Sequence, residues 1–462
     1  MGKDPIPVAR KIAKFVIKTR FADMQPDVVN KTKRLVLDQI GCIVGARGLP
    51  SSEMITEMAS EFGKNDESTV LGYGLKTSCT AAALANATMG HSLEMDDLHR
   101  EATIHPAVTV IPAALALGEK YRIPGEKLIE AVAVGYETAL RLGKGFLGKL
   151  YFQNFHPTGV CGVFGAAAAS SKVMNLSEDE IINSLGIAGS QASGLREARA
   201  AGTWGKRFQA GHASMCGVLS SVLAKKGFTG PETIFEGDSG FYKAYAHKGI
   251  YDLNKIDEEL GWKWELLNVA FKLHACCRFC APVIDAVLQA KKENEIKAEE
   301  VDRIWVGTYQ ASLDAITKPE ERKYRPQTIV DAQFSLPYCA ALAISKGRAF
   351  VQEFTEESIQ DRRVLDVASR IKWGLDEEAE QKYPQCFSAI VKIQTKSGKE
   401  LQARVDHAKG DIENPVSDSE LVSKFKGLSE GVLGEQKCEK VKSAVFSLEK
   451  MADICALTAS LR

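Results

Sequence analysis

The sequence GVCGVFGAAAASS, at Gly159–Ser171, consists mainly of glycine, alanine and serine. A second stretch of the same kind, TAAALANATMG, occupies Thr80–Gly90. Helices that carry such small side chains can pack with their axes close together. We therefore expect both stretches to form helices inside a tightly packed helical core.

Helical signals dominate the chain from its start to about residue 260. Ser177 and Glu180 form a capping-box pattern just ahead of the apolar Ile181, which marks the beginning of one of these helices. After Asn414-Pro415 the helical period returns and continues to the end of the chain. Both ends of the chain are therefore predicted to be helical.

The part of the chain between these helical regions shows the period of β-strands. Ile304, Val306 and Thr308 alternate with residues of different character, as in a half-buried strand. Two further alternating runs, 389–394 and 401–405, flank the turn sequence Lys396-Ser-Gly-Lys399. This arrangement predicts a β-hairpin.

The order of these signals predicts a mainly α fold with an α+β domain. We expect a large helical domain formed by both chain ends, with residues 1–265 as its first part and residues 411–462 as its C-terminal part. A smaller α+β lid domain, residues 266–410, is predicted to be inserted between them.

The composition narrows the possible partners and the compartment. Lysine and arginine together number 59, as do aspartate and glutamate, so the formal net charge is zero. Proteins that bind nucleic acid or membrane surfaces usually have a basic excess, so neither partner is expected. The longest apolar run, Ala107–Leu117, is too short to cross a bilayer. The 11 cysteines, an odd number, indicate reduced thiols and a cytoplasmic location.

Groups capable of acid–base chemistry gather in the segment GHSLEMDDLH, at Gly90–His99, which runs on to Ile104-His105-Pro106. A histidine in a mostly apolar cleft titrates near neutral pH and can move protons in both directions. The alternative is a helix end with capping acids and hydrogen-bonded core histidines.

Two further segments suit the binding of an anion. His156 stands just before a predicted helix, where backbone N–H groups without partners attract negative charge. Lys206 and Arg207 lie among glycines and aromatic residues, and such a pair can clamp a carboxylate. The alternative for His156 is a simple helix start without a ligand. The alternative for Lys206 and Arg207 is a basic pair that faces solvent.

The segment FKLHACCRFC, at Phe271–Cys280, combines Lys272, His274 and Arg278 in a possible anion-binding and proton-transfer group. Its cysteines also offer an iron–sulfur cluster as an alternative. Free cysteines are often just small buried hydrophobic residues. The cysteines concerned are Cys276, Cys277 and Cys280.

At these segments the sequence resembles the MmgE/PrpD family, and the resemblance covers essentially the whole chain. The family includes 2-methylcitrate dehydratase, cis-aconitate decarboxylase and iminodisuccinate epimerase. The motifs that carry the resemblance are His91–Asp97 with His105-Pro106, His156–Gly159, Gly205–Arg207 with Gly211-His212, Lys272 with Cys276–Arg278, Asp331–Tyr338, and Lys409-Gly-Asp with Asn414-Pro415.

The resemblance implies a homodimer that uses neither a metal nor an organic cofactor. Carried over by position, it implies acid–base and substrate-binding roles for Glu94, His105, His156, Lys206, Lys272 and Tyr324. Our interpretation of the two basic segments adds three substrate-binding candidates, namely Arg207, His274 and Arg278.

The sequence departs from the family pattern at several of these positions. Family members usually have Asp where Glu94 stands and commonly Thr where Leu98 stands. The His that often follows the Cys-Arg pair is absent at Ala281, and the decarboxylases place a His about where Cys277 stands. These changes should reshape one end of the pocket.

The candidate residues suit proton transfer at a carbon α to a carboxylate of a small di- or tricarboxylic acid. Cations would bind the substrate carboxylates and offset the charge that develops on the α-carbon. One of His105 and His156 would be the base, and the other, or Tyr324, the acid.

We expect a lyase that dehydrates an acid such as 2-methylcitrate or citrate. Decarboxylation of a cis-aconitate-like acid, or epimerisation of a substituted succinate, is the alternative on the same scaffold. Alternatives of other classes are an iron–sulfur hydro-lyase and a non-catalytic carboxylate-binding protein.

Overall fold

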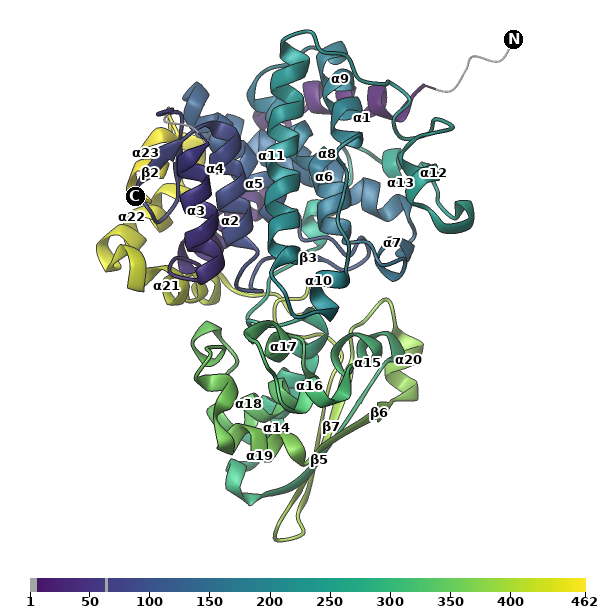
Figure 1. Cartoon of the computed structure of the whole chain (residues 1–462), viewed down its shortest axis with the longest axis vertical. Coiled ribbons are helices and arrows are strands. Elements are labelled where there is room, and N and C mark those ends of the chain that lie inside the picture. The colour runs from purple at the N-terminus through teal and green to yellow at the C-terminus, as the bar shows by residue number, and fades with distance from the viewer. Residues whose placement is uncertain (1–5, 63–64) are drawn as a thin grey trace. The chain divides into compact units, whose positions relative to one another are not determined.

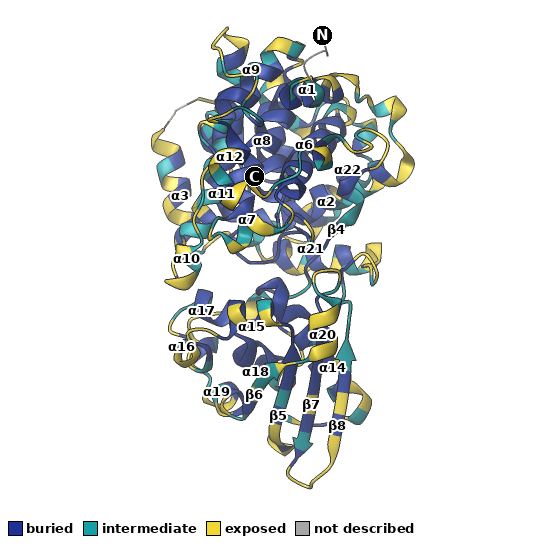
Figure 2. Ribbon diagram, turned by 90° about the vertical axis from the view of Figure 1, so that its right-hand side faces the viewer, coloured by how far each residue is buried: buried dark blue, intermediate teal, exposed yellow. Residues whose placement is uncertain are grey.

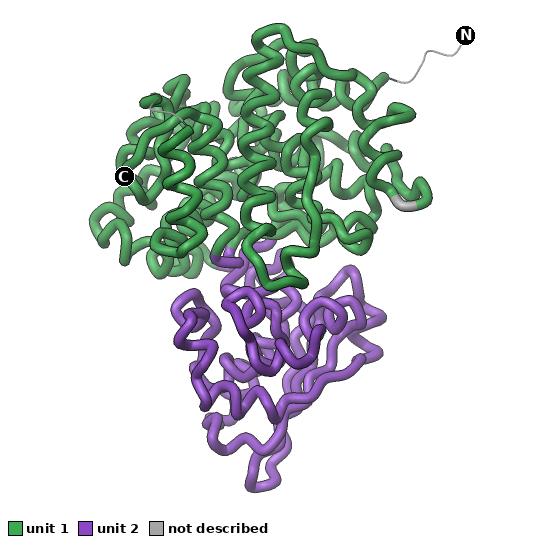
Figure 3. The backbone as a smooth tube through the Cα atoms, viewed as in Figure 1, with its two compact units in different colours: residues 1–92, 96–269, 417–462 green, residues 93–95, 270–416 purple. Residues whose placement is uncertain are grey.

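The structure is a computed structural model, and it describes residues 6–62 and 65–462. The described chain forms two compact units (Figure 3). Unit 1 comprises the chain up to Ser92, Asp96–Val269 and Ser417–Arg462, and unit 2 comprises Leu93–Met95 and Ala270–Val416. Unit 1 is helical and unit 2 combines helices with a sheet, so the predicted fold class, mainly α with an α+β domain, is confirmed.

Unit 1 is built mainly from helices (Figure 1). They are α1 (Val8–Lys18), α2 (Pro26–Gly45), α3 (Pro50–Glu61), α4 (Cys79–Gly90), α5 (Ala107–Tyr121), α6 (Gly125–Gly145), α7 (Lys149–Phe152), α8 (Pro157–Val173), α9 (Glu178–Gly189), α10 (Glu197–Ala200), α11 (Gly205–Lys225), α12 (Phe241–Tyr245), α13 (Asn254–Asp257), α21 (Asp418–Leu433), α22 (Glu435–Phe446) and α23 (Cys455–Ser460). The short strands β1 (Ser68–Val70) and β2 (Leu75–Thr77) pair antiparallel. Among the described residues, no helix combines the length and the apolar character that crossing a membrane requires.

Helix α8 lies in the core of unit 1, because it packs against α5, α6, α9 and α11 and all of its residues are buried (Figure 2). Its small side chains are needed for this packing. A Cβ added to Gly165 would lie 2.7 Å from the carbonyl oxygen of Gly135 in α6. Helices α4 and α11 are equally close, since a Cβ on Gly211 would lie 2.7 Å from the carbonyl oxygen of Leu84. The predicted close packing of the two small-residue stretches is confirmed.

Both ends of the chain contribute to unit 1. The C-terminal helix α21 packs against α2 near the start of the chain. At this contact Lys424 Nζ lies 2.6 Å from Asp38 Oδ1, and both side chains are 1% exposed. A buried ion pair of this kind is costly to break, because the partner left behind stays charged and desolvated.

Unit 2 is organised around a four-stranded sheet with the order β6-β5-β7-β8. The strands are β5 (Val301–Thr308), β6 (Ile371–Leu375), β7 (Ala389–Thr395) and β8 (Glu400–Val405). Strand β5 runs parallel to β6 and antiparallel to β7, and β7 runs antiparallel to β8. The predicted hairpin is therefore confirmed, with Gly398 at a φ of 85° in the turn that connects its strands.

The helices of unit 2 pack on this sheet and on one another. They are α14 (Ala281–Asn294), α15 (Gln310–Ile316), α16 (Glu320–Tyr324), α17 (Ile329–Gln333), α18 (Leu336–Lys346), α19 (Arg362–Ser369) and α20 (Glu377–Lys382). Helix α14 contacts β7, β8 and α18, and α18 also contacts α19. The single turn of 3-10 helix Arg278–Cys280 leads directly into α14, so the cysteine segment lies at the start of that helix.

Candidate active site

Three histidine rings lie together in unit 1. His91 follows the last residue of α4, His105 precedes α5, and His156 caps the start of α8. The rings of His91 and His156 are stacked with their centroids 5.5 Å apart, and the ring of His105 meets that of His91 edge-on at 5.1 Å. The ends of three core helices thus bring together side chains that are up to 65 positions apart in the sequence.

The carboxylate of Asp96 links two of these rings. Its Oδ2 lies 2.8 Å from Nδ1 of His91 and 3.0 Å from Nδ1 of His105. Burial opposes ionisation of this carboxyl, but the neighbouring His91 and His105 outweigh it and hold the pKa of Asp96 well below its usual range. Asp96 is therefore an anion that two imidazoles share.

These contacts fix which nitrogen of His105 carries the proton. Nδ1 of His105 lies 2.6 Å from the backbone carbonyl oxygen of Asp97 as well as near Asp96, so it is surrounded by acceptors and must be the donor. In the neutral ring Nε2 then holds the lone pair and can accept a proton. The backbone N–H of His105 donates to Thr158 Oγ1 at 3.1 Å, which ties the loop to α8.

Asp97 holds the loop between His91 and His105 in place. Its Oδ2 accepts a hydrogen bond from the hydroxyl of Tyr136 at 2.8 Å, and its Oδ1 accepts one from the backbone N–H of Ala107 at 3.1 Å. Burial and the adjacent negative charge of Asp96 raise the pKa of Asp97 well above its usual range. The two adjacent acids therefore differ, since the surroundings favour the charged form of Asp96 and disfavour the charged form of Asp97.

His91 and His156 are kept neutral by their surroundings. Burial lowers the pKa of His91 to about 4, although Asp96 acts in the opposite direction. Burial, followed by the charges of His91 and Lys206, holds the pKa of His156 well below its usual range. Among the described residues, the ring nitrogens of His156 make no well-formed hydrogen bond. A neutral imidazole of this kind can donate an N–H to an oxygen that becomes negative during a reaction.

The two cations at the start of α11 stand in different surroundings. The positive charge of Lys206 lowers the pKa of both His91 and His156, so Lys206 belongs to the same group. Arg207 is 7% exposed and donates from Nη1 to the hydroxyl of Ser51 at 3.0 Å. The structure thus brings His105, His156 and Lys206 together. The side chain of Arg207, which also belongs to α11, is anchored on Ser51 of α3.

A second group of candidate residues lies in unit 2. Nζ of Lys272 is 3.6 Å from Oε2 of Glu94, and the two side chains are 2% and 6% exposed. Glu94 has a φ of 54°, a left-handed conformation that is strained for this residue type and often found at functional sites. Within the described chain, Nζ of Lys272 makes no hydrogen bond. A buried ammonium whose hydrogen-bonding capacity is unused is well suited to receive a carboxylate.

His274 and Arg278 already have carboxylate partners. Nε2 of His274 lies 2.7 Å from Oδ1 of Asp285, and the other oxygen of Asp285 accepts the backbone N–H of Lys409 at 2.7 Å. Arg278 forms a buried ion pair with Asp411. Both side chains are therefore engaged by carboxylates inside unit 2, in the segment that also carries Lys272.

Tyr324 is at the end of α16. Its hydroxyl donates to the carbonyl oxygen of Ile371 at 2.7 Å, and its ring packs on Trp373 with a centroid distance of 5.2 Å. The side chain of Lys372 is also in contact with the hydroxyl. In the described structure none of these contacts joins Tyr324 to another candidate residue.

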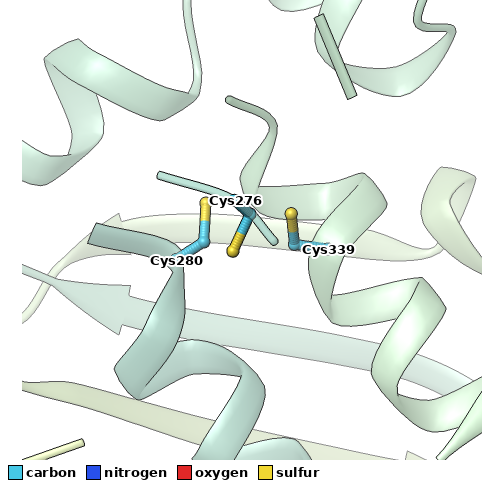
Figure 4. Close-up of side chains that lie close together, drawn as sticks. All are labelled: Cys276, Cys280 and Cys339. Atoms are coloured by element: carbon cyan, nitrogen blue, oxygen red, sulfur yellow. The ribbon is translucent and has the colours of Figure 1, made fainter. Parts of the chain in front are cut away.

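The cysteines of the Phe271–Cys280 segment are grouped differently from the sequence-based hypothesis. Cys276 and Cys280 gather with Cys339 of α18, a residue that the hypothesis omitted (Figure 4). Cys277 is not a member of this group, and its backbone N–H donates to the carbonyl oxygen of Gln333.

Sequence reasoning assigned no role to His91 and Asp96, although the structure places them at the centre of the histidine group. The signal for them was present, because both lie in the segment Gly90–His99 that was already notable for its histidines and acids. Thr158 lies in the motif His156–Gly159, but no role was assigned to it, and Tyr136 of α6 lay outside the motifs that were singled out.

Comparison with known proteins finds the same family in both halves of the chain. The model of the MmgE/PrpD N-terminal domain matches residues 10–254, and that of the MmgE/PrpD C-terminal domain matches residues 274–450. The cis-aconitate decarboxylase of Aspergillus terreus (strain NIH 2624 / FGSC A1156) is 29% identical over 456 residues, which cover 94% of this chain and 92% of the relative. The human cis-aconitate decarboxylase is 28% identical, with 94% and 90% covered.

A further relative has a different activity. The 2-methylcitrate dehydratase of Salmonella typhimurium is 24% identical over 213 residues, which cover 45% of this chain and 42% of the relative. Both kinds of relative are lyases, and the two domain models together account for most of the chain. The chain belongs to the MmgE/PrpD family and is an enzyme of the lyase type.

Proposed function

We propose that the protein is a lyase that removes a proton from the carbon α to a carboxylate of a small di- or tricarboxylic acid and then expels water. The observation that carries this proposal is the contact of the ionised Asp96 with Nδ1 of His105. Because this contact keeps the proton of the neutral ring on Nδ1, Nε2 of His105 is free to act as a base that Asp96 orients.

The proposed reaction has two steps. In the first, Nε2 of His105 takes the α-proton, and the electron pair of the C–H bond moves into the carboxylate to give an enediolate. In the second, the electrons return to form a C=C bond, the C–O bond at the β-carbon breaks, and the departing hydroxide takes the proton from Nε2 of His105 and leaves as water, which restores the neutral base. Asp96 stabilises the positive charge that His105 carries between the steps.

The neutral His156 and the cation Lys206 are the groups that we assign to the negative charge of the enediolate. An N–H donor that is held in place before the reaction stabilises such a charge without reorganisation. The low pKa of His156 makes it a hydrogen-bond donor rather than a permanent cation. Arg207 is proposed to bind a substrate carboxylate next to Lys206.

We further propose that Lys272 binds a carboxylate of the substrate, with Glu94 limiting the size of the acid that fits. Support comes from the buried ammonium, which has no hydrogen bond within the described chain. His274 and Arg278 are proposed to position Lys272, because their own side chains are held by Asp285 and Asp411. We do not assign the acid role to Tyr324, whose hydroxyl proton is engaged by Ile371.

Decarboxylation of an acid like cis-aconitate is the second candidate. The relatives that match over nearly the whole chain carry this activity in their names. The same groups would serve it, since loss of carbon dioxide also leaves electrons on a carbon next to the remaining carboxylates. His105 would then protonate carbon instead of removing a proton from it.

Proton NMR in heavy water, with the purified protein and a panel of citrate, 2-methylcitrate and cis-aconitate, tests both candidates. Dehydration predicts a vinyl product from a hydroxy acid together with deuterium at its α-carbon. Decarboxylation predicts a product that has lost carbon dioxide and gained one deuterium. The variant His105→Gln should abolish either signal, whereas the control His407→Gln, in unit 2, should retain it. No conversion and no exchange in any of these acids would refute the proposal.

We also propose that the protein acts as a homodimer. Three large apolar side chains, Leu195, Trp204 and Phe208, are 59%, 42% and 47% exposed in the single chain. Exposed large apolar side chains are common where a second subunit binds. Sedimentation at micromolar concentration, with Trp204→Glu as the disrupting variant, tests this proposal.

The proposed compartment is the cytoplasm. All of the cysteines are free thiols, as expected of a protein that works in a reducing environment. Localisation of the tagged chain in fractionated cells is the direct test.

A further inference from the structure

Three cysteine thiols of unit 2 face one another, and the proposed reaction uses none of them. Cys276 lies in the loop after Lys272, Cys280 caps the start of α14, and Cys339 comes from α18. Their exposed fractions are 1%, 0% and 0%. All three Sγ atoms lie within 4.8 Å of one another (Figure 4).

The spacing of these sulfur atoms fits a single ion better than a cluster of several metal ions. A zinc–sulfur bond of about 2.3 Å places two sulfur atoms on the same tetrahedral or trigonal ion about 3.8–4.0 Å apart. Each sulfur–sulfur distance would therefore have to shorten by at most about 1 Å for the three thiols to meet one ion. An iron–sulfur cluster would have to push them apart instead, because its irons and sulfides occupy the space between the ligating cysteines.

Polar groups accompany the three buried thiols. The thiol of Cys339 contacts the carbonyl oxygen of Ala332 at 3.5 Å. Lys272 and His274 lie four and two positions before Cys276, so basic side chains stand in the same segment as one of the ligands.

Backbone contacts hold the three ligands in position before any ion arrives. The N–H of Cys276 donates to the carbonyl oxygen of His274 at 2.9 Å, and the N–H of Cys280 donates to that of Cys277 at 2.9 Å. The N–H of Cys339 donates to the carbonyl oxygen of Ser335 in the first turn of α18. The ligands therefore come from two rigid helix starts and one hydrogen-bonded loop.

We propose that Cys276, Cys280 and Cys339 form a binding site for one thiophilic closed-shell cation of the Zn²⁺ and Cd²⁺ type. Soft sulfur ligands select such ions over Mg²⁺ or Ca²⁺. On binding, the protonated thiols release their protons to the solvent, three metal–sulfur bonds form, and no electron is transferred. The three thiols take no part in the reaction proposed above, so the proposed ion site does not depend on that reaction.

Titration of the reduced, metal-free full-length protein with CdCl₂ tests the site. The probe is Cd²⁺ itself, because cadmium–thiolate bonds give an ultraviolet charge-transfer band that histidine or carboxylate ligands do not give. The titration is run on the folded protein and, in parallel, on protein refolded with Cd²⁺ present, so that slow entry to the buried site does not hide binding. We expect one equivalent of Cd²⁺ with the thiolate band, and ZnCl₂ should displace it.

Matched variants identify the ligands. Cys339→Ala and Cys276→Ser should each weaken binding at least tenfold and remove most of the band. Cys161→Ala is the control, since Cys161 is a fully buried thiol of α8 that belongs to no such group. The unfolding midpoint gives a second readout, because one bound equivalent should raise it in wild type and in the control but not in Cys339→Ala.

Two results would overturn the proposal. The first is the absence of a thiolate band in both the folded and the refolded protein. The second is a bound equivalent that persists unchanged in Cys339→Ala, which would place the ion elsewhere, for example at the group His91, Asp96 and His105. Neither result bears on the lyase activity, which the heavy-water experiment tests separately.

Discussion

The substitution Asp96→Asn isolates the charge that the two histidines share. It keeps the size of the side chain but removes the anion that lies 2.8 Å from His91 Nδ1 and 3.0 Å from His105 Nδ1. During the proposed reaction His105 becomes an imidazolium, and it then has no counter-charge at this distance.

The magnitude follows from that distance. Two unit charges 3.0 Å apart attract each other by about 5.5 kcal/mol at an effective dielectric constant of about 20. Since about 1.36 kcal/mol corresponds to a tenfold change in rate, the full loss is about 10⁴-fold. The amide of Asn can still accept one hydrogen bond, so we expect kcat to fall by about 10²–10⁴-fold.

The assay is the rate of product formation and α-deuterium exchange by NMR, with the acid that wild type converts. Asp97→Asn is the matched control, because the side chain of Asp97 is bonded to Tyr136 and Ala107 rather than to a histidine ring. We expect the control to lose less than about tenfold. An Asp96→Asn enzyme that works within threefold of wild type, or a control that loses as much as Asp96→Asn, would refute the assignment of His105 and Asp96 as the base and its counter-charge.

Three other predictions concern binding and stability. Lys272→Met should lower kcat/KM by at least about 100-fold with the acid that wild type converts, because a charge-assisted contact to a carboxylate is lost. Steady-state kinetics check this, and an unchanged kcat/KM would remove Lys272 from the site. Folding lowers the pKa of His91 from 6.5 to about 4, so the unfolded chain protonates this ring at a higher pH than the folded chain. The free energy of unfolding should therefore fall by roughly 3 kcal/mol as the pH drops from about 6.5 to 4. Urea unfolding across this range should show the loss in wild type and a flatter curve in His91→Phe, and identical curves would contradict the neutral state of His91. Lys424→Met should lower the free energy of unfolding by about 3–5 kcal/mol, because the buried carboxyl of Asp38 loses its partner. The double variant with Asp38→Leu should recover much of this loss in the same urea assay, and a double variant no more stable than Lys424→Met would contradict the buried pair.

The local pattern of the sequence determined the kinds of elements that form. Small residues at Gly159–Ser171 predicted a core helix, and the structure shows why: a Cβ at Gly165 would touch the backbone of α6. The alternation at 389–405 predicted the hairpin of β7 and β8 for a similarly local reason. The hydrophobic period of a segment can be recognised in the sequence because the direction of each side chain depends only on the helix or strand that contains it.

The sequence also indicated where acid–base chemistry would be concentrated. The segment Gly90–His99 stood out by density alone, and its His91 and Asp96 proved to be the centre of the histidine group. Density could not show that the pKa of Asp96 is lowered while that of the adjacent Asp97 is raised. That difference arises because His91 and His105 lie beside Asp96, whereas Asp97 is buried next to the charge of Asp96.

Only the tertiary structure decided which charged side chains already have partners. In the sequence Lys272, His274 and Arg278 form one basic segment, yet Asp285 and Asp411 balance two of them and leave Lys272 beside Glu94. The thiol group likewise needed Cys339, which lies 59 positions after Cys280. Partners this distant in sequence are chosen by how helices and loops pack, and packing depends on the whole chain rather than on any local pattern.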